Sequence, residues 1–545
     1  MSGPGPMATP GSPAGGSPGL SDGRPSPGGA RRVATVGVVA VLLALAGVAN
    51  AEIRAHAGRP PAGPEVAPAV AVGKASSSAW FCPGPLPVGT LSEASSVAIT
   101  DVGTHPLTGD VTIAATSGRS STETVTIPVR GESVVGLRRH GPRGSAAVTV
   151  VVNGSGAAVD ELVHGSEGVS ATPCSQSPAP SAYFAAGSTQ GASNLSLGVY
   201  DPGATPAVVD VSFVTSSGTV APPAFQDMSV GPGQVVVLDV GHYVPSEAAV
   251  ATLVHSTGGG VAAGTLLTAV VGHALMTSLV DGVDGSARSW LVPAGPTGER
   301  MASSFSVLNP GCRKTLVHLQ LGAGGTAAEL TASVPAHGLV TLRPGLAGDG
   351  GAMSWATVRS SGAPVVVARE TLVIPQPPTR EVTARRAAAR PSPAQATGSA
   401  QAPTSVAAAA TAAAARPPSA QAAPVLLAGV AVTSGVTAAA PTWVLPGGES
   451  DARTSEVVVI QNPSRRPARV EVERLAALRG AVPIAAVPPL EVQPGEVVSV
   501  DMADVVRSDG TLPLLVKASR PVVAGEMLYG RITAGFTLPA AIAVR

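Results

Sequence analysis

The sequence predicts an all-β protein, in which tandem Ig-like antiparallel β-sandwich units follow one N-terminal transmembrane helix. Three observations lead to this prediction. The 545-residue chain is 44% hydrophobic but only 3% aromatic, and its apolar residues are mainly Val and Ala, of which Val favours strands. Short alternating segments are separated by turn signals at intervals of about 8 to 15 residues. An aromatic opening motif recurs four times along the chain.

The charge composition excludes one class of partner. There are 34 Lys and Arg residues against 34 Asp and Glu residues, which leaves no broad basic surface for nucleic acid. Only 12% of the residues are charged. This low charge content, together with 65 Gly and 52 Pro residues, excludes a coiled coil, a polytopic membrane protein and a typical soluble α/β enzyme.

The N-terminal region predicts export. Residues 1–32 contain sixteen Gly or Pro residues, so we expect a disordered cytoplasmic leader. The apolar run Val33–Ala49 follows Arg31 and Arg32. We therefore expect residues 33–51 to form a signal anchor that keeps its basic side in the cytoplasm.

This anchor implies a single-pass plasma membrane protein whose C-terminal portion is extracytoplasmic. The tripeptide Ala49-Asn50-Ala51 leaves an alternative open, because cleavage after Ala51 would make the protein secreted. Residues 52–75 are rich in Pro and Ala and are expected to form an extended stalk. In both cases the remainder of the chain is exported.

Four aromatic residues mark the repeats: Trp80, Tyr183, Trp290 and Trp443. We interpret them as structural packing residues, since they recur at one position of each repeat. The alternative, a platform that stacks on sugars, is less favoured because the chain has few other aromatic residues. The predicted units are β-sandwiches at 76–178, 179–286, 287–440 and 441–545.

A polar residue ends the strand that follows each aromatic marker. These residues are Asp101, Asp201, Asn309 and Asn462, and each precedes a turn. Asx side chains cap such turns, so we expect a structural role for them and no ligand site.

The third unit contains a low-complexity insertion. Residues 376–424 hold nineteen Ala and eight Pro residues, and we expect them to be a disordered extension of a hairpin loop. The arginines of this insertion suggest contact with an anionic envelope polymer or, more simply, a solvated loop.

The three cysteines suggest one disulfide. Cys82 lies in the opening motif of the first unit and Cys174 in its closing segment. In an exported chain this arrangement favours a structural disulfide between them, while two unpaired thiols are the alternative. Cys312 has no evident partner.

No catalytic, cofactor-binding or metal-binding motif is expected. The one G-x-S-x-G match, Gly15-Gly16-Ser17-Pro18-Gly19, lies in the leader and lacks the strand and helix that a nucleophile elbow needs. We find no Walker A or H-E-x-x-H motif. We therefore predict that the protein is not an enzyme and takes no cofactor.

The opening Trp80-Phe81-Cys82-Pro83-Gly84, the Trp-x-x-Pro motifs at 290 and 443 and the N-terminal anchor carry a family resemblance. The chain resembles a family of uncharacterised actinobacterial membrane-anchored envelope proteins, a domain-of-unknown-function family. The resemblance implies an envelope setting and no catalytic residues.

From these features we expect a non-catalytic scaffold or protein-binding module of the cell envelope, with an envelope protein as its partner. A module that binds cell-wall glycan is the first alternative, which makes a cell-wall polymer the partner. An exported hydrolase with an unrecognised loop active site is the second.

Overall fold

The computed structural model describes residues 68–72, 76–88, 94–137, 144–165, 167–271, 274–298, 300–323, 326–344, 353–374, 428–476, 480–506, 511–531 and 535–545. The predicted leader, signal anchor, most of the stalk and the insertion 376–424 lie outside these residues. Within them, no helix is both long and apolar enough to cross a membrane.

Nearly all regular structure in the described ranges is β-strand, grouped into four successive units that lie in one compact body, Pro64–Arg545. Unit 1 comprises β2 (Ser77–Val88), β3 (Ala94–Asp101), β4 (Leu107–Ala115), β5 (Ser120–Ile127), β6 (Glu132–Gly136), β7 (Gly144–Asn153), β8 (Ala157–Gly165) and β9 (Gly168–Pro173). Unit 2 comprises β10 (Ser181–Phe184), β11 (Ser193–Asp201), β12 (Ala207–Thr215), β13 (Gly218–Val220), β14 (Met228–Val230), β15 (Gln234–Asp239), the short helix α2 (Val240–Tyr243), β16 (Ala251–Ser256), β17 (Ala262–Val271) and β18 (Ala274–Asp281).

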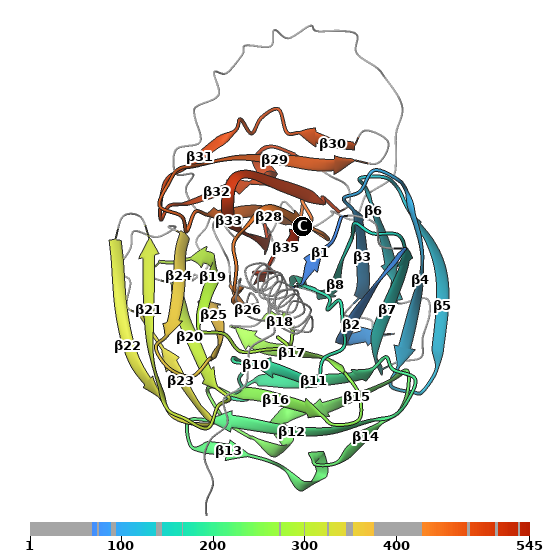
Figure 1. Ribbon diagram of the computed structural model, residues 1–545, viewed down its shortest axis with the longest axis vertical. Coiled ribbons are helices and arrows are strands. Elements are labelled where there is room, and N and C mark those ends of the chain that lie inside the picture. Colours follow the sequence, from blue (N-terminus) through green and yellow to red (C-terminus); the bar gives the residue numbers. More distant parts are fainter. Residues whose placement is uncertain are drawn as a thin grey trace, which may run out of the picture. The chain divides into compact units, whose positions relative to one another are not determined.

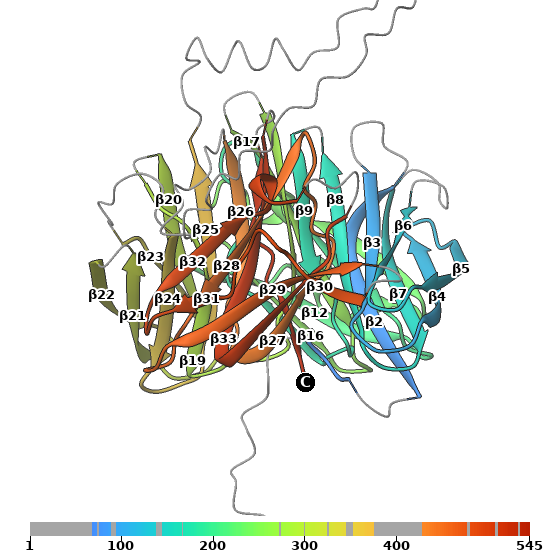
Figure 2. The same ribbon diagram turned by 90° about the horizontal axis from the view of Figure 1, so that it is seen from above.

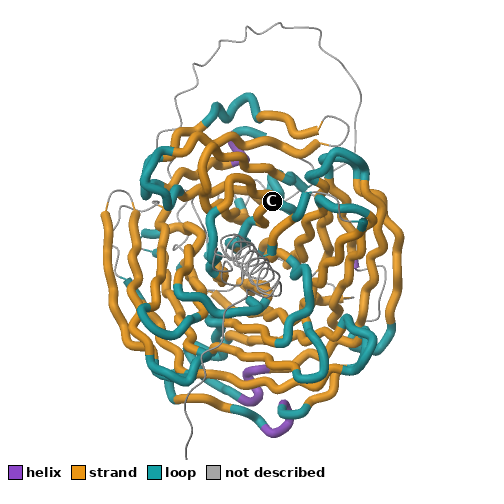
Figure 3. The backbone as a smooth tube through the Cα atoms, in the orientation of Figure 1, coloured by secondary structure: helices purple, strands orange, loops and turns teal. Residues whose placement is uncertain are grey.

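The second half of the chain repeats this succession (Figures 1 and 3). Unit 3 comprises β19 (Ser289–Pro296), β20 (Met301–Asn309), β21 (Thr315–Ala323), β22 (Thr326–Val334), β23 (Gly338–Leu342), β24 (Met353–Ser360), β25 (Val366–Val373) and β26 (Gly429–Ser434). Unit 4 comprises β27 (Ala440–Leu445), β28 (Thr454–Gln461), β29 (Ala468–Ala476), β30 (Gly480–Pro483), β31 (Leu490–Val492), β32 (Val497–Asp501), β33 (Leu514–Gly530) and β34 (Phe536–Thr537).

Each unit folds its strands into two antiparallel sheets. Unit 1 has the orders β2-β7-β4-β5 and β6-β3-β8-β9, and unit 3 has β19-β24-β21-β22 and β23-β20-β25-β26. Unit 2 follows the same scheme, and in unit 4 the long strand β33 serves both sheets. We call the sheet that contains the first strand of a unit its outer sheet and the other its inner sheet.

This strand order corrects one prediction. In an immunoglobulin sandwich the first two strands belong to the same sheet, whereas here they lie in different sheets. The β-sandwich architecture therefore holds, but the predicted Ig-like topology is wrong. Alternation and turns locate strands along the chain, but they do not determine which strands pair with each other.

Burial distinguishes the two kinds of sheet. Outer strands such as β4 and β21 alternate between buried and exposed residues, whereas the inner strands β3 and β28 are buried on nearly every residue. A strand buried on both faces needs a packing partner on each side. The inner sheets therefore pack on their own outer sheets and on neighbouring units.

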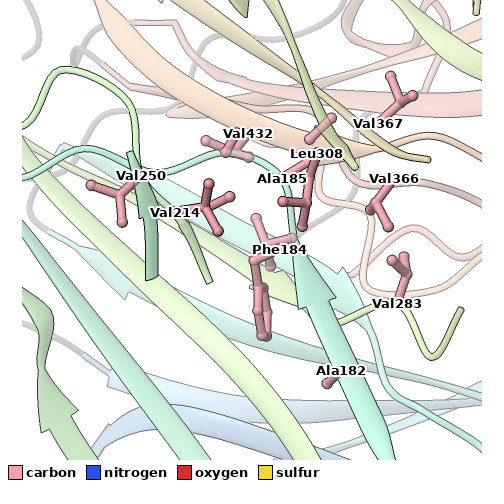
Figure 4. Packing of buried hydrophobic residues seen from close by; sticks show 14 of the residues in the cluster. Ala182, Phe184, Ala185, Val214, Val250, Val283, Leu308, Val366, Val367 and Val432 are labelled. Carbon is pink, nitrogen blue, oxygen red and sulfur yellow. The ribbon is translucent and has the colours of Figure 1, made fainter. Parts of the chain in front are cut away.

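The hydrophobic cores are continuous between units, as Figure 4 shows for units 2 and 3. Phe184, at the end of β10, belongs to the same buried cluster as Leu308, Val366 and Val432 of unit 3. At the next contact, Met527 and Phe536 of unit 4 cluster with residues of unit 3. The units are thus packed into one body.

The contacts also return from unit 4 to unit 1. Leu528 of β33 clusters with Ala98 and Leu162 of unit 1. The N-terminal strand β1 (Ala69–Val70) pairs in parallel with the C-terminal strand β35 (Ile542–Val544), which in turn pairs with β27 of unit 4. The four units therefore close on themselves, and the segment before unit 1 extends a sheet of unit 4 (Figures 1 and 2).

Candidate functional site at the unit junctions

Three of the four aromatic markers are buried within the described part of the chain. Trp80, Trp290 and Trp443 are fully buried, and Tyr183 is partly buried in β10. The Nε1–H groups of Trp290 and Trp443 each donate to two backbone carbonyls of their own unit, at 2.7 to 3.2 Å. These tryptophans have no exposed ring face that could stack on a sugar.

The Asx residues cap the turns as expected. In each unit the side-chain oxygen accepts a backbone N–H two residues ahead, at 2.8 to 3.0 Å. The residues are Asp101, Asp201, Asn309 and Asn462.

A buried polar position recurs in the central strand of each inner sheet. The strand registers pair Glu161 with Val97, Thr265 with Leu197, Arg369 with Phe305 and Glu526 with Val458. All four polar residues are at most 3% exposed. Burying a polar side chain without hydrogen-bond partners costs free energy. We therefore compare which groups surround this position in the different units. We call it the junction position.

In unit 1 the junction position forms part of the contact with unit 2. Glu161 Oε2 accepts a hydrogen bond from Gly84 N–H at 3.1 Å, and its carboxyl group hydrogen-bonds Asp281 at the end of β18. Burial raises the pKa of Glu161 to about 7. Burial and the nearby Glu161 charge raise the pKa of Asp281 well above its usual range, so the pair shares a proton over a wide pH range.

The predicted cysteine pair lies beside these carboxyls. Cys82 and Cys174 form a disulfide, and Glu161 lies within 4.8 Å of both sulfurs. Two thiolates and a carboxylate would suit a metal ion, but the sulfurs are already bonded to each other. This group therefore does not form a metal site. Cys312 is exposed and forms no disulfide.

In unit 3 the junction position carries a buried cation. The Arg369 guanidinium donates to Ser354, Ser303, Thr371 and the Pro296 carbonyl at 2.8 to 3.3 Å. It also lies 5.6 Å from the centre of the Phe305 ring. Burial lowers the pKa of Arg369 to about 9. Hydroxyl and carbonyl oxygens therefore satisfy this charge without a carboxylate.

In unit 4 the junction position contributes to an acidic cluster at the contact with unit 1. Glu526 lies near Glu456 of its own unit and near Glu132 and Asp160 of unit 1. Asp160, Glu456 and Glu526 are at most 3% exposed. Burial and mutual repulsion raise the pKa values of these three carboxyls well above their usual range. We call the four residues the acidic junction.

The contact between units 2 and 3 contains a groove of about 590 Å³. It lies between β17 and strands β20, β23 and β25. Its lining combines hydroxyl groups and small apolar side chains with Arg343 and Glu370, whose charges attract each other. No aromatic residue is among the described groove residues.

Sequence reasoning missed both the junction position and the groove. A polar residue within a valine-rich strand, as in Val522-Val523-Ala524-Gly525-Glu526, was the available signal. In units 1 and 4 the groups around this position include residues of another unit, Asp281 for Glu161 and Glu132 for Glu526, which are far away in the sequence.

Comparisons with known proteins identify a domain family of unknown function and name no activity. A family of unknown function (DUF5719) matches residues 161–422, which confirms the resemblance to a domain family without an assigned function. No curated protein matches the chain. A solved structure, the tetra-tandem repeat in the extending region of a large adhesion protein, is 11% identical over 86% of this chain and 99% of that chain. Its TM-score is 0.10, so the likeness carries no argument.

Proposed function

We propose that this chain is a non-catalytic, membrane-anchored extracytoplasmic protein that serves as a cell-envelope scaffold and protein-binding module. The groove between units 2 and 3 is its binding site in this proposal. The groove is the observation that carries the proposal, because it is a sizeable concave surface on a framework whose units are packed together.

The lining favours a protein segment as the ligand. Hydroxyls such as Ser304 and Thr341 supply hydrogen bonds, Met301 and Leu372 supply apolar contact, and Arg343 supplies charge at the rim. An extended peptide segment presents backbone hydrogen-bonding groups and alternating side chains, so a groove with both polar and apolar groups suits it.

The buried disulfide supports the extracytoplasmic setting. Disulfides persist in oxidising compartments, and Cys82 and Cys174 are both 0% exposed. The same disulfide is compatible with the secreted form that cleavage after Ala51 would produce.

Cell-wall glycan is the alternative ligand. Glycan sites commonly stack sugar rings on aromatic faces, since an aromatic side chain offers a large flat surface. The described lining of the groove has no aromatic residue, and the marker tryptophans are buried. Both facts favour the protein partner.

Site-specific photo-crosslinking in cells tests the proposal. A photo-reactive amino acid at Ala302, an exposed groove residue, should capture one envelope protein. The same group at Glu329, exposed on the outer sheet of unit 3, should not capture it. We expect Arg343→Glu to reduce the crosslink about tenfold and Arg359→Glu, on the outer sheet, to leave it unchanged.

Two results would count against this function. Equal capture at Ala302 and Glu329, together with sedimentation of the purified protein with cell-wall glycan, would favour the glycan-binding alternative. Turnover of an envelope substrate that one loop substitution abolishes would favour the exported hydrolase.

A further inference from the structure

The acidic junction brings together carboxylates from two units that the chain does not connect directly. Glu132 is in β6 and Asp160 in β8 of unit 1, whereas Glu456 is in β28 and Glu526 in β33 of unit 4. Asp160 is paired with Ala98, and Glu456 is paired with Leu528.

An apolar contact holds these strands against each other. Leu528 of unit 4 packs with Ala98 and Leu162 of unit 1, and Gly447 of unit 4 donates its N–H to Glu132 Oε1 at 2.9 Å. The carboxylates are therefore enclosed between two packed sheets, where water cannot solvate them as it does at a surface.

Three of the four residues have buried carboxylate oxygens without a hydrogen-bond partner: Asp160 Oδ1, Glu456 Oε1, Glu456 Oε2 and Glu526 Oε1. Glu132, by contrast, is hydrogen-bonded by Thr100, Gly447 and Thr511. Both oxygens of Glu456 are unpartnered although this residue is 0% exposed. Buried polar groups are normally satisfied, so these oxygens indicate a positively charged ligand.

The four units show that this chain has other ways to bury polar groups. Arg369, at the same position of unit 3, has hydrogen bonds from its guanidinium to four residues. Glu161 of unit 1 has the Gly84 N–H and Asp281, although its Oε1 has no hydrogen-bond partner. Among the described residues, Glu456 has no partner at either oxygen, and Glu526 has none at Oε1.

We propose that the acidic junction binds one divalent cation of the calcium class and thereby fastens unit 4 to unit 1. Carboxylate oxygens without His or Cys are the ligands that hard cations prefer. Asp160 and Glu132 would supply ligands from one unit, and Glu456 and Glu526 from the other.

Binding requires a rearrangement of side chains. Among the described residues, no three of these carboxylates have oxygens that all lie within 4.8 Å of one another. Glutamate side chains have three rotatable bonds, and cation binding offsets the cost of rotating them because it reduces the repulsion between buried charges. The ion neutralises two of the four negative charges.

The location gives the ion a structural role. Units 1 and 2, 2 and 3, and 3 and 4 are each joined by the chain itself, whereas units 4 and 1 meet only through non-covalent contacts. A cation held by both units would strengthen that contact.

Calcium titration of the full-length protein tests the site. After treatment with EDTA and its removal, we expect added Ca²⁺ to raise the melting temperature and elemental analysis to find one Ca²⁺ per chain. The double variant Glu456→Gln/Glu526→Gln should bind Ca²⁺ at least 100-fold more weakly. Glu329→Gln, at an exposed position, should bind Ca²⁺ as the unmodified protein does.

The possible outcomes separate the explanations. Loss of binding in the double variant, or in Asp160→Asn where the double variant does not fold, supports the site. Equal Ca²⁺ binding by all variants places the ion elsewhere and overturns the proposal. Absence of binding and of any thermal shift with Ca²⁺, Mg²⁺ or Mn²⁺ also overturns it.

Discussion

Replacing Glu161 by glutamine alters the carboxyl pair at the contact between units 1 and 2 while preserving its shape. Glutamine still accepts the Gly84 N–H, which lies 3.1 Å from Oε2 in the unmodified protein. Its amide N–H also donates to a carboxyl oxygen of Asp281. The variant therefore keeps the hydrogen bonds but removes one ionisable group and one buried negative charge.

The size of the effect follows from the pKa of Glu161. Burial raises this pKa from 4.5 to about 7. A carboxyl whose pKa is higher in the folded state binds its proton more tightly there, so its contribution to stability is fully present below pH 4.5 and is lost as the pH rises to 7. Since one pKa unit corresponds to about 1.4 kcal/mol, the loss is on the order of 3 kcal/mol.

Urea unfolding at pH 5 and pH 8, followed by tryptophan fluorescence, measures this effect. At pH 5 we expect Glu161→Gln and the unmodified protein to have similar free energies of unfolding. At pH 8 the variant should be more stable by about 3 kcal/mol, whereas Glu329→Gln, which is exposed, should match the unmodified protein at both pH values. A difference for Glu161→Gln that is the same at pH 5 and pH 8 would refute the shared proton.

Three further predictions concern packing and closure. Replacing Cys82 and Cys174 by alanine removes a link across 92 residues, and should lower the free energy of unfolding by about 4 to 5 kcal/mol in urea titrations. Gly264→Ala should lower the free energy of unfolding by about 3 kcal/mol in thermal melting, because its Cβ would overlap the Gly84 carbonyl oxygen. Gly259→Ala, whose Cβ would have no atom within 4 Å, is the control. Val70→Asp places a charge at a position only 1% exposed in β1, and should reduce hydrogen-exchange protection of the Arg545 N–H, which bonds the Val70 carbonyl.

The sequence was sufficient to predict features that depend on neighbouring residues. Alternation located the outer strands, and the turn after each Asx residue was predicted because its hydrogen bond spans only two residues. The hairpin that carries the insertion was also located correctly, since β25 pairs with β26 on its far side. These interactions are encoded within short segments of the chain.

The strand order and the closure of the four units could not be predicted in this way. The first strand pairs with the sixth in units 1 and 3 and with the seventh in units 2 and 4, and β1 pairs with β35 at the opposite end of the chain. Such contacts depend on the packing of whole sheets. Nothing in the composition of residues 69–70 distinguishes a strand that joins unit 4 from an extended stalk, which is how the sequence was interpreted.

The junction position shows why the polar sites were harder to predict than the fold. All four units place a residue at the same register on the same kind of strand, yet the residues are Glu161, Thr265, Arg369 and Glu526. A repeat whose only requirement was an apolar core would place an apolar residue there. The surroundings differ between units: Asp281 of unit 2 lies beside Glu161, oxygen acceptors of unit 3 itself surround Arg369, and carboxylates of unit 1 lie near Glu526. The repeated fold supplies the position, and in units 1 and 4 the groups around it come partly from a neighbouring unit.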